Sequence, residues 1–390
     1  MVSNEIISND YINKRMKIAL IGPVYPYRGG IAHYTTALAS AFGKAGHDVR
    51  VYSFSRQYPK WLYPGKSDKD PSQPIQRIEA IFSIDTLNPI TWFKTANLIG
   101  QYQPDLVILQ WWTTFMAPAF RTLTNQLKRS GTPLLYIIHN VFPHELKPWD
   151  SYLVKSTLSL SDAFLVHSKR EKDKITLSLP EKKIYYHELP IFEIDGNKII
   201  NKRVAKQYLK LDPVIPTLLF FGIVRPYKGL RDLLHSLAIL KNDGYSFVLL
   251  IAGEFWEKVD YYRELVNELN LQNNVIFHNR YIPNEEVSYF FSAADLFVAP
   301  YREGTQSASI RLAIGYGIPI VISNAIEDNI ITNMGKAIIF EKGNIHSLVN
   351  ALRLVVNDLP LDNKNANYMV VDNLWNSLIN EIQQIFRDLR

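Results

Sequence analysis

Short, almost wholly apolar runs recur along this chain, and they constrain its fold more than any other feature. Met16–Pro23 (MKIALIGP), Asp105–Trp112 (DLVILQWW) and Thr217–Gly222 (TLLFFG) are examples. Runs of this length and composition are typical of strands that are buried on both faces of a parallel sheet. Stretches with helical periodicity, such as Ile31–Gly46, lie between several of them. The alternation predicts an α/β protein, because parallel strands need helical crossovers.

The runs form two series separated by a polar linker at about 191–203. In the first series we predict strands at 16–23, 47–54, 105–112, 133–140, 162–168 and 183–190. In the second we predict strands at 217–222, 247–253, 275–278, 296–300, 319–323 and 336–340. Two doubly wound sheets in succession leave a cleft between them, and ligands of such sheets bind at the carboxyl ends of the strands.

The domain organisation follows from these series. We expect a polar N-terminal tail at 1–15, a first domain at 16–195 and a second at 204–364. A helical segment at 365–390 carries Leu374, Leu378, Ile382 and Ile385 on one face. We expect it to pack back on the first domain.

Residues 57–76 interrupt the alternation. They are rich in Pro, Gly, Lys and Asp and show no clear period, so they predict a long surface loop. Asp68-Lys69-Asp70 within this loop has the Asp-x-Asp spacing of a metal–diphosphate motif. It does not follow a strand, and such triplets are frequent by chance, so we predict no metal site.

Composition narrows the class of protein. Of 390 residues, 47% are hydrophobic and 21% charged, which is typical of a globular chain with two cores. There is no cysteine, which excludes disulfides and thiolate metal sites. No apolar run approaches the roughly 20 residues of a membrane span. The N-terminus is too polar for a signal peptide. We therefore expect a cytoplasmic protein.

The positive charge is concentrated in the first half. Residues 1–190 contain 23 Lys and Arg against 15 Asp and Glu, whereas residues 191–390 contain 20 against 22. A basic first domain is suited to anionic lipid headgroups or a phosphorylated acceptor, and an ordinary solvated surface is the alternative. Nucleic acid is not an expected partner, because no basic cluster interleaved with aromatic residues occurs.

The stretch Tyr301–Val321 combines a strand end, a polar turn and the start of a helix. Backbone N–H groups and a helix dipole at such a turn suit a phosphate, and the acidic Glu303 suits neutral hydroxyls. Phosphate beside hydroxyls indicates a nucleotide-sugar. An ordinary βα turn capped by a small hydroxyl residue is the alternative.

Several motifs follow one another in the second half of the chain, and their order is typical of one protein family. FFGIVRPYKG is followed by VLLIAGE, by NVIFHNRYIPNEEVSYFFSAADLFVAPYREG and by a helix that ends in Gly and Pro. In this order the chain resembles a retaining glycosyltransferase of the GT-B fold, of the family 4 type. The resemblance covers Met16 to the C-terminus, and residues 217–321 are its most specific part.

The resemblance implies two Rossmann-like domains facing each other across a cleft. It also implies an enzyme that moves a sugar from a nucleotide-diphosphate sugar to a glycan or lipid-linked acceptor. Such enzymes need no metal or other cofactor, and the pathway implied is cell-surface polysaccharide synthesis at the inner face of the membrane. Retention by same-face attack comes from the resemblance alone.

Residues able to hold a diphosphate occur in the loop after the first strand of the second domain. Without a metal, cations and N–H groups must stabilise the leaving diphosphate. Arg225 offers a planar fork and Lys228 a mobile point charge. The resemblance makes them the diphosphate clamp, and a solvated basic turn is the alternative. In many relatives the arginine directly follows the glycine, where this chain has Ile223, so Arg225 would serve as a substitute from a position nearer to Lys228.

Two features of the first domain would face this clamp. Gly29 and Gly30 let a backbone approach a sugar or phosphate closely, although they also fit a plain tight turn. His139 ends a strand, and the resemblance places it near the reacting centre, whereas a structural histidine is the alternative. His144 and Glu145 rank lower as candidates for the same cleft.

The stretch Tyr301–Val321 departs from the family in one respect. Relatives have two glutamates separated by seven residues, and Glu303 fits the first, but Arg311 stands eight positions on. A guanidinium only donates hydrogen bonds, so Arg311 cannot accept from ribose hydroxyls as a carboxylate would. It remains open whether Arg311 changes the nucleotide pocket, the donor or catalysis. The turn at Gly304, Thr305, Gln306 and Ser307 still presents N–H groups to a donor.

Other functions remain alternatives. A non-catalytic nucleotide- or glycan-binding protein of the same fold would tolerate Arg311. A sugar-nucleotide epimerase or a phosphorylase of this architecture is a further possibility, but no Schiff-base lysine for pyridoxal phosphate is identified. Tyr58, Trp61 and Trp111-Trp112 either line an acceptor site or a membrane face, or belong to a core or its rim.

Overall fold

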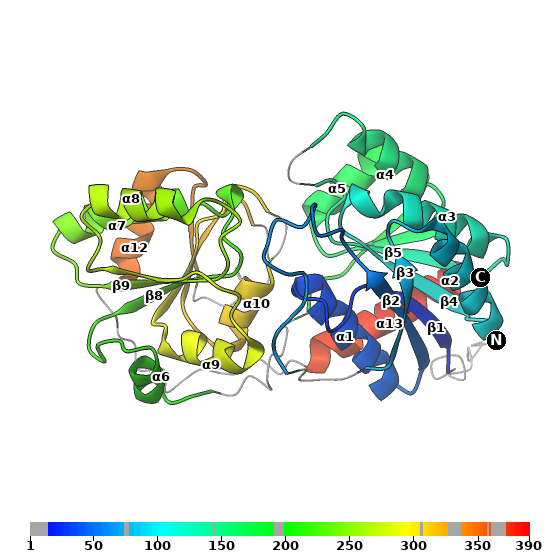
Figure 1. Cartoon of the computed structure of the whole chain (residues 1–390), viewed down its shortest axis with the longest axis horizontal. Coiled ribbons are helices and arrows are strands. Elements are labelled where there is room, and N and C mark those ends of the chain that lie inside the picture. The colour runs from blue at the N-terminus through cyan, green and yellow to red at the C-terminus, as the bar shows by residue number, and fades with distance from the viewer. Residues whose placement is uncertain are drawn as a thin grey trace, which may run out of the picture.

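Two α/β domains lie side by side in the computed structural model (Figure 1). The structure describes residues 15–73, 78–143, 146–190, 199–304, 307–326, 337–356, 359 and 372–390. In every pair of neighbouring strands within these ranges the two strands run parallel. The α/β class, with one parallel sheet in each of two Rossmann-like domains, is therefore confirmed.

The first sheet has seven strands in the order β3-β2-β1-β4-β5-β6-β7. The strands are β1 (Lys17–Ile21), β2 (Asp48–Arg56), β3 (Ala80–Asp85), β4 (Leu106–Trp111), β5 (Leu134–Ile138), β6 (Ala163–Val166) and β7 (Lys183–Tyr186). The helices are α1 (Gly30–Lys44), α2 (Pro89–Tyr102), η2 (Thr114–Met116), α3 (Ala117–Lys128), α4 (Asp150–Leu158) and α5 (Lys169–Ser178). Strand β3 was not predicted, because it lies at the edge of the sheet and exposes Ile81 and Phe82.

The second sheet has six strands in the order β10-β9-β8-β11-β12-β13. They are β8 (Thr217–Phe221), β9 (Val248–Ala252), β10 (Val275–His278), β11 (Leu296–Ala299), β12 (Ile320–Ser323) and β13 (Ala337–Phe340). The helices are α6 (Lys202–Tyr208), η4 (Pro226–Lys228), α7 (Leu230–Asn242), α8 (Val259–Glu268), α9 (Asn284–Ala293), α10 (Ala308–Gly315) and α12 (Ile345–Val356).

Helices cover both faces of each sheet, and this explains why the strands are apolar without alternation. In β1, Ile18 and Leu20 pack in the core on one face, whereas Ala19 and Ile21 pack in the core on the other. Successive side chains of a strand point to opposite faces, so a strand covered on both sides must be apolar at every position.

The helix α13 (Asp372–Asp388) runs beside α1 at the first domain, although it follows the second domain in sequence (Figure 1). Trp375, Leu378 and Ile382 belong to the same buried cluster as Ile18 and Leu38.

The segment 57–73, predicted to be a surface loop, lies against the second domain. We call it the strap. The Tyr281 hydroxyl donates to Asp70 Oδ2 at 2.7 Å, and the Asn284 amide donates to Ser72 Oγ at 2.9 Å. Sequence periodicity could not find these contacts, because they join residues more than 200 positions apart.

No helix among the described residues is long and apolar enough to span a membrane.

Candidate functional site

The site lies where the strand order of each sheet reverses. In the first sheet the reversal is between β1 and β4, and in the second it is between β8 and β11. Crevices at these points of a doubly wound sheet bind ligands at the carboxyl ends of the strands. Gly22 and Gly222 directly follow β1 and β8 and keep the two crevices open. A Cβ at Gly22 would lie 2.7 Å from Gln110 Cγ, and one at Gly222 would lie 3.0 Å from Lys228 Nζ.

Two helix N-termini meet between the domains. A Cβ added at Gly30, the first residue of α1, would lie 3.3 Å from the Cβ of Ala308, the first residue of α10. Gly29 caps α1 with a φ of 106°, which favours glycine, and Ser307 caps α10. Neither cap makes a side-chain hydrogen bond to its helix. The first-turn N–H groups and the positive ends of two dipoles therefore converge, an arrangement that favours an anion.

A cavity of about 160 Å³ opens beside this meeting point. Residues from both domains line it: Gly30, Ile31, Tyr34, Ile138, His139, Asn140, His167, Ser168, Glu171, Leu189 and Ala308. The predicted residues Gly30 and His139 are thus brought together. Tyr34, His167 and Glu171 were not predicted. His167 follows a buried strand just as His139 does, and this position was the signal that could have found it.

Hydrogen bonds fix the tautomer of His167. Its Nδ1 lies 2.8 Å from the His187 carbonyl oxygen, which can only accept, so Nδ1 carries a proton. Burial, together with the nearby His139 and Arg311, lowers the pKa of His167 to about 3, so the ring is neutral at pH 7. Its Nε2 must then accept from the Tyr34 hydroxyl at 2.8 Å.

His139 is held as a hydrogen-bond acceptor toward the cavity. Its Nε2 lies 2.6 Å from Gln110 Oε1, and a carbonyl oxygen requires a donor. Burial lowers the pKa of His139 to about 3, which keeps the ring neutral. The remaining nitrogen, Nδ1, therefore has only a lone pair to offer. It is suited to accept a hydrogen bond from a sugar hydroxyl.

Lys228 is buried among polar groups at the end of β8. It retains 8% of its exposure, and its Nζ is 5.2 Å from the centre of the Tyr301 ring. Burial would lower the pKa of Lys228, but the neighbouring Tyr301 and Tyr227 hydroxyls outweigh it, and the pKa is raised. A buried cation is costly unless it is compensated, so this site is suited to an anionic ligand.

Arg225 lies near Lys228 but is held differently. Its guanidinium stacks 5.4 Å from the centre of the Trp256 ring and 5.7 Å from that of Tyr227. Its side chain is half-buried at the mouth of the crevice. The stacking orients the planar fork, which suits a phosphate.

Glu303 and Arg311 lie in opposite environments. Glu303 is on an exposed turn, whereas Arg311 in α10 is only 1% exposed. The charge of Arg311 contributes to the lowered pKa of His167 in the other domain. The charge of Arg311 therefore acts across the domain boundary on a residue that lines the cavity. Gly304 packs tightly, since a Cβ there would lie 2.7 Å from Ile326 Cδ1.

Four candidates, Thr305, Gln306, His144 and Glu145, lie outside the described residues. Trp111 is completely buried in the first core, and Trp112 donates to the Tyr58 hydroxyl at 2.7 Å. Within the described ranges no cluster of three or more His, Asp or Glu could hold a metal ion. The Asp70 carboxylate already has hydrogen-bond partners: it accepts from Ser72 within the strap and from Tyr281 of the second domain.

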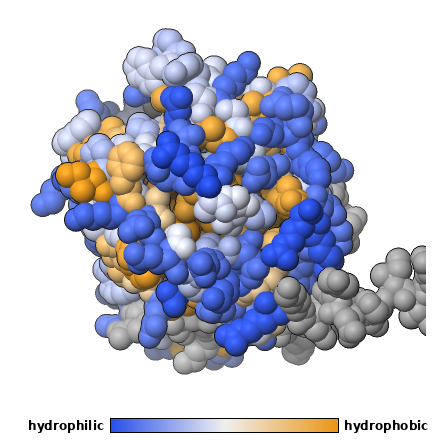
Figure 2. Space-filling model, turned by 90° about the vertical axis from the view of Figure 1, so that its right-hand side faces the viewer, coloured by the Kyte–Doolittle hydropathy of each residue, from blue (hydrophilic) through white to orange (hydrophobic). Residues whose placement is uncertain are grey.

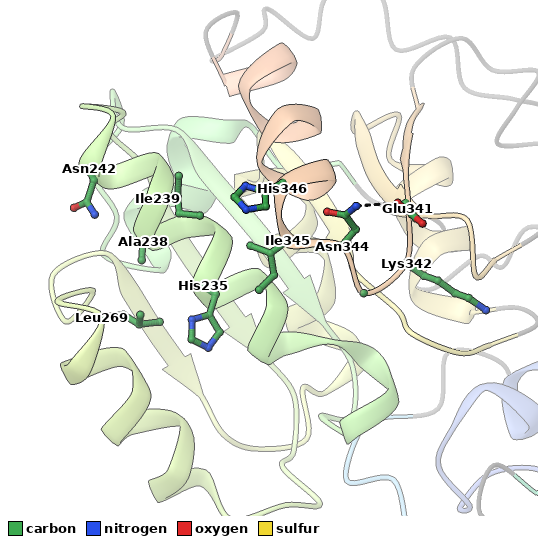
Figure 3. Close-up of a pocket in the computed structure, with 11 residues that line it drawn as sticks. His235, Ala238, Ile239, Asn242, Leu269, Glu341, Lys342, Asn344, Ile345 and His346 are labelled. Atoms are coloured by element: carbon green, nitrogen blue, oxygen red, sulfur yellow. Dashed lines mark hydrogen bonds between the residues drawn. The ribbon is translucent and has the colours of Figure 1, made fainter.

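A larger cavity of about 730 Å³ lies elsewhere on the second domain (Figure 3). It is lined by α7, by Leu269 and by the turn that leads into α12. The polar residues of that turn cap the helix: Asn344 donates to Glu341 at 2.8 Å and accepts from the Ser347 amide at 3.0 Å. The structure thus gives these groups a local role, and the cavity lacks the converging helix ends of the cleft.

Two family models match consecutive parts of the chain. Glycosyltransferase Family 4 matches residues 28–186, and Glycosyl transferases group 1 matches residues 203–369. Among curated proteins, CapJ of Staphylococcus aureus is 31% identical over 99 residues, which are 25% of each chain. The chain thus spans about a quarter of the length of that relative.

Solved structures share the fold over nearly the whole chain. Sucrose-phosphate synthase from Thermosynechococcus elongatus has a TM-score of 0.68 at 17% identity and covers 96% of this chain and 99% of its own. HepE of Anabaena in complex with UDP has a TM-score of 0.66 at 14% identity and covers 96% and 97%. At these identities the likeness concerns the fold, and it confirms the predicted GT-B arrangement of two Rossmann-like domains.

Proposed function

Because this chain belongs to the glycosyltransferases, with a family 4 first half and a group 1 second half, we propose that it transfers a sugar from a nucleotide-diphosphate sugar. The observation that carries the proposal is the meeting of two helix N-termini, neither with a side-chain cap hydrogen bond, beside the buried Lys228. A diphosphate is the ligand class that best matches two positive helix ends and an ammonium. HepE has been solved with UDP and with UDP-glucose, which makes a UDP-sugar the first donor to test.

In the proposed reaction the chain's own groups take the charge. Lys228, Arg225 and the N–H groups of α1 and α10 stabilise the diphosphate as the bond to the sugar breaks. His139 accepts a hydrogen bond from a sugar hydroxyl through Nδ1 and so orients the ring. Glu303 and the turn that includes Gly304 and Ser307 hold the donor from the second domain. The acceptor hydroxyl gives its proton to the leaving phosphate, with retention of configuration, and no metal is required.

The purified protein is expected to hydrolyse or transfer slowly from at least one UDP-, GDP- or dTDP-sugar with EDTA present. Released nucleoside diphosphate is the measurement, and a parallel series with added Mg²⁺ is the control for metal dependence. Intact nucleotide binding without turnover for any donor would favour a non-catalytic binding protein, the alternative that Arg311 keeps open. Turnover that disappears with EDTA would contradict metal independence.

We further propose a glycan or lipid-linked acceptor in cell-surface polysaccharide synthesis, reached by a cytoplasmic protein at the inner face of the membrane. The support is an exposed aromatic and basic surface on the first domain. Trp149 and Tyr152 of the α4 region are 57% and 65% exposed, and Lys147 lies 5.6 Å from the centre of the Trp149 ring. At the start of α2, Ile90 is 64% exposed. Figure 2 shows hydrophobic patches among hydrophilic ones over this end of the molecule.

Binding to vesicles that contain anionic lipid is expected to weaken as salt rises from 50 to 300 mM, because screening shortens the reach of the basic domain. Co-sedimentation measures the bound fraction, and vesicles of zwitterionic lipid are the control. A Trp149→Ala variant should bind more weakly at every salt concentration. Binding that is insensitive to salt, or equal on both vesicle types, would contradict the membrane contact.

A further inference from the structure

Tyr301 lies at the centre of a buried polar chain in the second domain. It directly follows Pro300 at the end of β11, and it is 3% exposed. Its hydroxyl lies 3.1 Å from Ser307 Oγ, which lies 3.0 Å from Ser309 Oγ. The ammonium of Lys228 lies beside the same residue, with its Nζ 5.2 Å from the centre of the Tyr301 ring, and the two groups interact electrostatically. The chain therefore runs from the diphosphate clamp to the N-terminus of α10.

The direction of the hydrogen bonds in this chain follows from its charged end. An ammonium can only donate, so it favours the orientation in which the Tyr301 hydroxyl turns its oxygen lone pairs toward Lys228 and gives its single proton to Ser307. Ser307 can then donate to Ser309. A phenylalanine at position 301 would break this order at its first link, although it would fill the same space.

Space around the ammonium of Lys228 is limited, so its neighbour Tyr301 influences the position of Nζ. A Cβ at Gly222 would come within 3.0 Å of Lys228 Nζ and 3.4 Å of Ser309 Oγ. Lysine is a mobile point charge on a flexible stem and depends on its surroundings for a defined position. Within this crevice the hydroxyl of Tyr301 is a polar neighbour that can define the position of Lys228.

We propose that Tyr301 is a positioning residue that holds the ammonium of Lys228, through its hydroxyl, where the leaving diphosphate of the donor develops its charge. The inference rests on the proposed function and adds a residue that neither the family motif nor the cleft lining identified. The electrostatic coupling is consistent with it: burial would raise the pKa of Tyr301, but Lys228, Ser307 and Ser309 together outweigh burial and the pKa is lowered.

Tyr301→Phe is expected to lower kcat at least about 10-fold with a smaller change in KM, the range for losing a polar contact with a charged group. Because Tyr301 raises the pKa of Lys228 against the effect of burial, its loss should lower that pKa. Two quantities should be measured against pH: kcat/KM, and UDP affinity by calorimetry. In both profiles the alkaline limb should move to lower pH. A residue that served packing alone would not move this limb.

Tyr316→Phe is the matched control. Tyr316 is another tyrosine of the same buried cluster, and its hydroxyl donates to Ser288 at 3.0 Å. This variant should keep the wild-type limb. Unchanged kcat and limb in Tyr301→Phe, or equal shifts in both variants, would overturn the inference. If the wild type binds UDP without turnover, the transferase proposal fails while the affinity profile still decides the role of Tyr301. If it binds none of UDP, GDP, ADP and dTDP, both proposals fall.

Discussion

Replacing Lys228 by Ala is expected to lower turnover at least about 100-fold, the scale of one lost transition-state contact in an anion-stabilising site. Lys228 supplies a buried positive charge between the end of β8 and the N-terminus of α10. The diphosphate gains negative charge as the sugar leaves, so the loss should fall mainly on kcat. Steady-state kinetics with the donor found in the panel give both constants.

Two further variants make the Lys228 result interpretable. Lys228→Met retains most of the volume without the charge, so it should lose activity to the same extent while unfolding near the wild-type urea concentration. Lys342→Ala removes an exposed lysine from the turn before α12 and should leave turnover unchanged. Near-wild-type rates in both Lys228 variants would refute the clamp. Glu303→Ala tests the second half of the assignment, with an expected loss of the same size.

Replacing Glu254 by Ala is expected to open the cleft. The side chains of Arg28 and Glu254 are each 5% exposed and form an ion pair between the domains. Glu254 also accepts from the Lys66 amide of the strap at 2.8 Å. Burial raises the pKa of this carboxyl, but the Lys66 amide and Arg28 outweigh that effect and the pKa is lowered. Removing one partner of a buried pair costs about 3–5 kcal/mol, because the other charge stays desolvated.

A two-domain protein can avoid this cost by separating its domains rather than by unfolding. Glu254→Ala should therefore increase the radius of gyration in X-ray scattering and lower kcat/KM at least about 100-fold, the factor equivalent to about 3 kcal/mol. Asp243→Asn is the matched control, since it breaks an exposed ion pair with Arg353 inside the second domain. An unchanged radius of gyration together with unchanged kinetics would show that the pair does not hold the cleft closed.

The strands could be predicted because each is buried on both faces, which leaves a continuous apolar run in the sequence. The edge strand β3 was not predicted for the opposite reason. Half-exposed residues such as Phe82 do not belong to a continuous apolar run. The contacts of the strap were not predicted because its partners, such as Tyr281 and Asn284, lie in the other domain. Local periodicity contains no information about contacts of that range.

Part of the candidate site could be predicted in the same way. His139, which directly follows β5, and Gly29, in the loop between β1 and α1, were found from their position at the carboxyl ends of strands. Tyr301 was noted only as the first residue of the turn, because a tyrosine beside an apolar strand looks like a core residue. Its hydroxyl acquires a role only when β8 brings Lys228 alongside β11.

The helix α13 also determines when the first domain can be completed. During synthesis the ribosome finishes α1 and β1 early, but their cluster of buried residues includes Trp375, Leu378 and Ile382 from near the end of the chain. Until those residues emerge, one face of the first domain remains uncovered while the second domain already has its own core. The order of the domains in the sequence is thus the reverse of the order in which their packing can be finished.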